Sequence, residues 1–116
     1  MRLVISVAGL RVMPAWRRYV ERRLAFALER FGERIGLVRV RLTDVNGPKG
    51  GMDKRCMILL RVHPAGDIRV AAVASLPSEA VDGASDRASR AVTKALAQNK
   101  RRTDRRHWRE SVRQLR

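Results

Sequence analysis

The stretches LVRVRLT (residues 37–43) and RCMILLRV (residues 55–62) decide the fold, because apolar side chains recur at every second position in both. The apolar phase comprises Val38, Val40 and Leu42 in the first stretch and Cys56, Ile58, Leu60 and Val62 in the second. A period of two predicts strands that bury one face. The segment between them is rich in turn residues, with Asn46-Gly47-Pro48 and Gly50-Gly51. We therefore expect an antiparallel hairpin with a long loop over residues 44–54.

Two further strands flank this hairpin in the sequence, over residues 2–8 and 68–74. Their apolar phases are Leu3, Ile5 and Val7 in the first and Ile68, Val70, Ala72 and Ala74 in the second. The turn His63-Pro64-Ala65-Gly66-Asp67 precedes the last strand. The alternation again predicts one buried and one exposed face.

Apolar residues at steps of three and four predict two amphipathic helices. The first begins near Pro14, spans about 17 residues and ends at Gly32, a common C-terminal stop. Its apolar side comprises Trp16, Val20, Leu24, Ala27, Leu28 and Phe31. The second begins near Pro77, and its narrow apolar stripe comprises Val81, Ala84, Ala88, Ala91, Val92, Ala95 and Leu96. Gly83 costs about 1 kcal/mol there relative to Ala, which close packing of that turn would justify. The pattern ends near Lys100, after which we expect a frayed end or a disordered tail.

The predicted order of elements is β-α-β-β-β-α, and the fold class is therefore α+β. Its simplest closure is a two-layer sandwich, with a four-stranded sheet and both helices on one face. The 116 residues fit one domain. We expect that domain over residues 1–101 and a basic, flexible C-terminal tail over residues 102–116.

Charge is the most unusual property of the composition. Lys and Arg total 26 against 11 Asp and Glu, a net charge of +15. Self-repulsion of this size destabilises a compact state, so it indicates a negatively charged partner, and RNA fits best. An anionic membrane surface would also attract the charge, but no apolar run is long enough to span a bilayer. The single cysteine, Cys56, excludes an intramolecular disulfide and suits the reducing cytoplasm.

The second helix carries the sharpest concentration of this charge. Arg87, Arg90, Lys94 and Arg101 are spaced 3, 4 and 7 apart, which places them on one side, opposite the alanine-rich stripe. Most charged runs are simply solvated helix faces. Such faces usually mix both signs, because like charges four residues apart repel. The single sign here favours a site for a polyanion.

Other basic residues form weaker candidates. Arg2, Arg39, Arg41, Arg55, Arg61 and Arg69 share the outward phase of the strands. Solvation of that face and a second RNA-facing surface explain them equally well. Stacking aromatics are missing from this phase, so phosphate contact is preferred over base stacking there. In the hairpin loop, Lys49, Lys54 and Arg55 are candidate phosphate contacts. Trp108 in the tail would either stack on a base or pack back on the domain.

The sequence contains no recognisable catalytic set. Its acidic residues are scattered, and neither Ser nor Cys has an evident base nearby in the sequence. One Cys and two His are too few for a structural zinc site. We therefore expect a protein that is not an enzyme and needs no metal or other cofactor.

Three stretches together resemble a known family. They are Trp16–Leu24 with Phe31, the loop Asp44–Cys56, and Ala80–Ala84 followed by Asp86, Arg87 and Arg90. With them, residues 1–102 resemble the bacterial ribosome hibernation-promoting factor and ribosome-associated inhibitor family, in its short form. The resemblance implies a fold like that of double-stranded-RNA-binding domains. It also implies binding in the mRNA and tRNA channel of the small ribosomal subunit, which blocks translation.

The resemblance implies RNA-binding roles for Arg22, Arg23, Arg87, Arg90 and Lys94, continued by Lys100, Arg101 and Arg102. With Lys54 and Arg55 from the loop, these are the expected site residues. We expect a cytoplasmic monomer whose partner is the small subunit and its rRNA, with no membrane or small-molecule substrate. A general nucleic-acid-binding protein or RNA chaperone is the alternative. The additional C-terminal domain of long forms, which pairs ribosomes, is not expected here.

Overall fold

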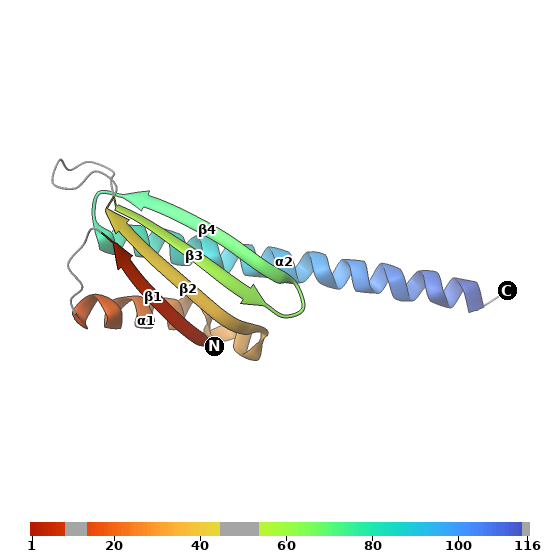
Figure 1. The fold of residues 1–116 in the computed structure, drawn as a ribbon. Helices are drawn as coiled ribbons and strands as arrows, with labels where there is room; N and C mark the ends of the chain where they lie inside the picture. The colour runs from red at the N-terminus through yellow and green to blue at the C-terminus, as the bar shows by residue number, and fades with distance from the viewer. Residues whose placement is uncertain (9–13, 45–53, 115–116) are drawn as a thin grey trace.

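A computed structural model describes residues 1–8, 14–44 and 54–114 (Figure 1). Its elements are β1 (Arg2–Ala8), α1 (Pro14–Leu28), the 3-10 helix η1 (Glu29–Arg34), β2 (Ile35–Asp44), β3 (Lys54–Val62), β4 (Gly66–Ala74) and α2 (Pro77–Gln114). This order confirms the predicted β-α-β-β-β-α arrangement. The hairpin loop, including Lys49, lies outside the described residues except for its ends.

The four strands form one mixed sheet in the order β1-β2-β3-β4. β1 runs parallel to β2, whereas β3 runs antiparallel to both β2 and β4. Ile58 pairs with Val40 on one side and with Val70 on the other. The register therefore brings the predicted apolar phases onto one face of the sheet.

Both helices cover that apolar face, as Figure 1 shows. The core between the two layers contains Val20, Leu24, Leu28, Val38, Val40, Leu42, Cys56, Ile58, Leu60, Val62, Ala84, Ala88 and Val92, with Leu3, Ile5 and Val70 packed at its edge. On the opposite face, Arg39, Arg41 and Arg69 are exposed. The predicted two-layer sandwich with an open, basic sheet face is confirmed.

Small residues let α2 approach the sheet closely. Ala80, Ala84 and Ala88 are fully buried along its inner side. A Cβ atom added to Gly83 would lie 3.1 Å from Cβ of Ala72 in β4. The close packing that would justify a helical glycine is therefore present.

The first helix ends slightly before the predicted stop. α1 ends at Leu28, and η1 continues the chain to Arg34. Gly32 lies inside η1 with a φ of 57°, a left-handed conformation that glycine adopts without steric cost. The glycine thus marks the change of direction into β2, four residues after α1 ends.

The second helix ends later than its apolar pattern indicated. α2 continues to Gln114, and residues 101–114 are all exposed. The expected end near Lys100 was wrong because apolar periodicity reports burial and not helicity. Arg, Lys, Gln and Glu favour helix even without a packing surface. The projecting turns give the molecule a length of 69 Å against a width of 24 Å (Figure 1). The division into a domain over 1–101 and a flexible tail over 102–116 stays a prediction.

Candidate nucleic-acid interface

A line of exposed cations follows the outer side of α2. Arg87, Arg90, Lys94 and Arg101 are all exposed, as their spacing predicts. We call these four residues the basic stripe. They lie on the side of the helix away from the buried alanines. The stripe can contact successive phosphates of one RNA strand without any movement of the core.

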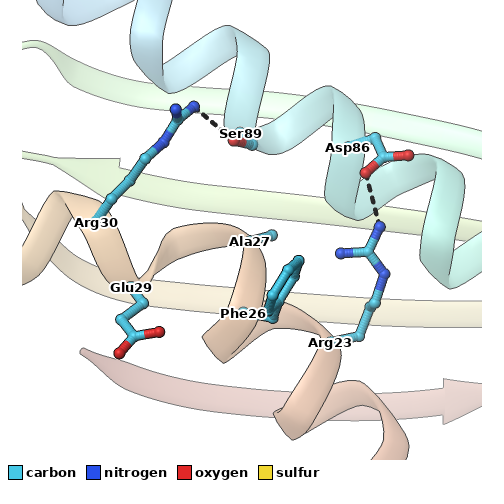
Figure 2. A pocket seen from close by; sticks show the side chains of 7 residues that line it. All are labelled: Arg23, Phe26, Ala27, Glu29, Arg30, Asp86 and Ser89. Atoms are coloured by element: carbon cyan, nitrogen blue, oxygen red, sulfur yellow. Dashed lines mark hydrogen bonds and ion pairs between the residues drawn. The ribbon is translucent and has the colours of Figure 1, made fainter.

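Two acidic residues of α2, Asp82 and Asp86, lie on another side of the helix, facing α1. Asp86 accepts a hydrogen bond from Nη2 of Arg23 at 2.7 Å, and Asp82 accepts one from its Nε at 3.2 Å (Figure 2 shows the first). The Tyr19 hydroxyl also donates to Asp82, and this bond raises the pKa of Tyr19. In this part of α2, Asp82 and Asp86 therefore lie at the interface with α1, while Arg87, Arg90 and Lys94 lie outside it.

Arg23 therefore plays a different part from the stripe. Its side chain is only 22% exposed, and both carboxylates hold it between the helices. The neighbouring Arg22 is exposed on α1. Of these two predicted RNA contacts, the structure leaves Arg22 directed to solvent and places Arg23 in an ion-pair network.

Arg30 belongs with the stripe, although its position in the sequence did not indicate this. Its Nη2 donates to Ser89 Oγ and Thr93 Oγ1 of α2, both at 2.9 Å, and its guanidinium lies 4.8 Å from the centroid of the Phe31 ring. A shallow concavity is lined by Arg30, Arg90, Thr93, Lys94, Ala97, Gln98 and Arg101. In the sequence, Arg30 was only one of several arginines on the first helix, and its contact with α2 joins residues 59 apart.

Arg87 sits at the edge of the stripe nearest the sheet. One of its guanidinium nitrogens, Nη1, donates to the backbone oxygen of Ala71 in β4. Backbone groups on an edge strand lack partners on one side. Arg87 therefore also ties α2 to the edge of the sheet, in addition to contributing charge.

The remaining predicted site residues lie elsewhere. Lys54 is 15% exposed and its Nζ lies 3.0 Å from Oδ2 of Asp44, where β2 and β3 meet the hairpin loop. Arg55 is exposed on β3 in the outward phase, on the face of the sheet opposite the helices. The structure thus does not bring Arg55 together with the stripe.

The projecting end of α2 extends the basic surface. Lys100, Arg101 and Arg102 are exposed, and a second concavity is lined by Arg102, Arg105, Arg106, Arg109, Glu110 and Arg113. Trp108 is 69% exposed on these turns. Its side chain therefore does not pack back on the domain, which was one of its two predicted roles.

Residues 1–8, 14–44 and 54–114 give little support for a metal site, a membrane-spanning helix or a reactive cysteine. No group of three or more His, Cys, Asp or Glu there is arranged to hold a metal ion. None of the helices in this part of the chain is long and apolar enough to cross a membrane. Cys56 is fully buried, and desolvation raises the pKa of its thiol to about 12, so it is not an activated nucleophile.

Comparisons with known proteins agree with this architecture. Residues 3–100 match the family model described as Sigma 54 modulation protein / S30EA ribosomal protein. The N-terminal domain of Protein Y from Thermus thermophilus is 26% identical and superposes with a TM-score of 0.66, covering 81% of this chain and 98% of that one. A ribosomal subunit interface protein from Coxiella burnetii is 17% identical, with a TM-score of 0.67 and coverage of 84% and 99%. The search of curated proteins found no match. Because the family model spans most of the sequence, the chain belongs to the Sigma 54 modulation protein / S30EA ribosomal protein family, whose members are ribosome-associated hibernation and subunit interface proteins.

Proposed function

We propose that the protein binds the small ribosomal subunit and silences translation by occupying the channel of mRNA and tRNA. Family membership supports a ribosomal partner. The single observation that carries the proposal further is the basic stripe, a line of cations of one sign on a rigid helix. A channel walled by rRNA phosphates is the surface that such a line complements.

The mechanism is steric occupancy. Asp82 and Asp86 are held against α1 by Arg23, so the neighbouring part of the basic stripe meets phosphates with less local repulsion. Each phosphate contact releases counterions, which makes affinity fall steeply with salt. The protein transforms no substrate in this scheme, needs no cofactor, and works as a cytoplasmic monomer.

The two parts of α2 have different tasks under this proposal. The domain over residues 1–101 supplies the packed face with the stripe. Within the tail over residues 102–116, the turns up to Gln114 add arginines on an exposed helix, whose like charges four residues apart repel until phosphates neutralise them. These arginines extend the basic surface beyond the domain.

One observation favours a second function. Cations also cover the open sheet face, away from the stripe, and continue along the projecting turns of α2. Charge spread over several surfaces suits a general nucleic-acid-binding protein or RNA chaperone, which needs no fixed orientation on its partner.

A competition experiment separates the two functions. The protein is mixed with purified small subunits at near-physiological salt and excess bulk RNA, and the subunits are pelleted. A silencing factor stays in the pellet, and added mRNA analogue competes with it for the channel. If bulk RNA removes the protein in proportion to its phosphate content, the channel proposal is wrong and the general binder is right.

A further inference from the structure

We propose that Phe26 forms a stacking site for one unpaired nucleobase beside the basic stripe. The inference rests on the proposed function only in taking RNA as the partner. Phe26 is 81% exposed, the highest value among the large apolar side chains of the described residues. It lies on α1 between the buried Leu24 and Leu28, and its phase directs it away from the core. The fold itself makes no use of this ring.

Arginines surround the ring at helical spacing. Arg22 and Arg23 precede Phe26 by four and three residues, and Arg30 follows it by four. Side chains three and four residues apart are neighbours on the surface of α1, and Arg30, which lies in η1, lines the same concavity as Phe26. Figure 2 shows Phe26 between Arg23 and Arg30, with Asp86 and Ser89 on the facing helix α2. An exposed aromatic ring amid guanidinium groups is the arrangement by which proteins bind single-stranded nucleic acid.

A concavity beside Phe26 is lined by Arg23, Phe26, Ala27, Glu29, Arg30, Asp86 and Ser89. Its chemistry suits a base better than a phosphate. Arg23 is already paired with Asp86, and Arg30 donates to Ser89. Glu29 also lines the concavity, and a carboxylate repels phosphate but accepts hydrogen bonds from the amino groups of bases. A flat base stacked on Phe26 therefore contacts the face of its ring, N–H donors of Arg23 and Arg30, and the carboxylate acceptor of Glu29.

The concavity beside Phe26 adjoins the basic stripe, which is the proposed contact for the phosphates of the same strand. Arg30 lines both this concavity and the one containing Arg90 and Lys94. A strand whose phosphates follow the stripe therefore passes next to Phe26. Arg22, which is exposed on the same helix, can neutralise a phosphate on the other side of the ring. The site takes a nucleotide from a loop, bulge or single strand, because paired bases are already stacked.

The test compares single-stranded RNA with duplex RNA. Affinities of the full-length chain for a 12-nucleotide single strand, and for a blunt duplex of the same sequence, are measured at several salt concentrations. Phe26→Ala should weaken single-strand binding by about 5- to 150-fold, the range for loss of a stacking aromatic. Duplex binding should stay unchanged, as should the dependence of log affinity on log salt, because no cation is lost.

Variants of the same residue sharpen the test. Phe26→Tyr keeps the ring and should bind like wild type, whereas Phe26→Leu keeps apolar surface without the ring and should lose most of the affinity. Val73→Ala, at a half-exposed position on β4, is the matched control and should have no effect. Equal losses on both RNAs, no loss on either, or full binding by Phe26→Leu would each overturn the proposal. If Phe26→Ala binds both RNAs like wild type but binds intact small subunits more weakly, Phe26 contacts a ribosomal protein instead. These outcomes can be read whether or not the channel proposal survives its own test.

Discussion

Nη2 of Arg23 lies 2.7 Å from Oδ1 of Asp86, so an ion pair joins α1 to α2 at the edge of their interface. The same guanidinium contacts Asp82 through Nε at 3.2 Å. Two of the few acidic groups on α2 are thereby neutralised beside the basic stripe. Arg23 therefore reduces the negative charge beside the stripe even if it touches no phosphate. This effect on RNA affinity can be measured separately from direct phosphate contact.

The first prediction concerns the stripe itself. Arg90→Glu combined with Lys94→Glu should abolish binding to the small subunit at near-physiological salt. Both side chains are exposed, so the circular dichroism spectrum should not change. In the single Ala variants, the slope of log affinity against log salt should fall by about one per residue. Arg87 is best tested alone, because it also binds the backbone of Ala71.

Arg39→Glu with Arg41→Glu is the matched control for charge, since both residues lie on the open sheet face. We expect this pair to retain most of the specific binding. If the control loses as much affinity as the stripe variant, the site lies on the sheet or is spread over the whole surface.

The second prediction separates the two roles of Arg23. Arg23→Met should lower the free energy of unfolding by about 1 kcal/mol, a modest value because Asp82 and Asp86 remain partly solvated. It should also weaken RNA binding, since two carboxylates are left without their cation. Adding Asp82→Asn and Asp86→Asn should restore affinity in a filter-binding assay. A triple variant as weak as Arg23→Met would show that Arg23 contacts phosphate directly.

The third prediction concerns the projecting turns of α2. Ending the chain after Arg101 should change the free energy of unfolding by less than about 0.5 kcal/mol, because residues 102–114 are exposed throughout. The salt slope of RNA binding should fall by roughly 0.7–0.9 for each phosphate contact that is lost. Urea titration and binding at several salt concentrations check the two parts. An unchanged slope would remove the tail from the interface.

The fourth prediction tests the close approach of α2 to the sheet. Gly83→Ala should gain up to about 1 kcal/mol of helix propensity but lose about 1–3 kcal/mol from crowding against Ala72. We expect a net loss of about 1 kcal/mol in urea unfolding. In the background of Ala72→Gly the same substitution should become stabilising. A gain in the wild-type background would mean that the two layers separate at little cost.

The fifth prediction uses the buried thiol of Cys56. Its pKa is raised from 9.0 to about 12 by desolvation, so the folded state binds this proton more tightly than the unfolded state. The contribution to stability is fully present below pH 9 and is lost as the pH rises from 9 toward 12. At pH 8, a thiol reagent should react only after denaturant is added. Cys56→Ala, which lacks the thiol, should show a shallower fall in stability over this alkaline range.

Much of the fold could be predicted from local patterns. Alternation at Val38, Val40 and Leu42 identified a strand and its buried face, because side-chain direction in a strand follows from backbone geometry alone. The spacing of Arg87, Arg90 and Lys94 placed them on one side of a helix for the same reason. The end of α2 could not be predicted in this way, because the residues from Arg101 to Gln114 are helical without being buried.

The sequence by itself therefore determined the order of the elements, the core face of each, and the presence of a single-sign stripe. Only the tertiary structure decided which cations are held by other side chains and which are directed to solvent. Arg23 is held by residues 59 and 63 positions away, and Arg30 by residues equally distant. Arg55 lies on the opposite face from the helices. Periodicity describes one element at a time, whereas neutralisation of a charge depends on what packing brings within about 4 Å of it.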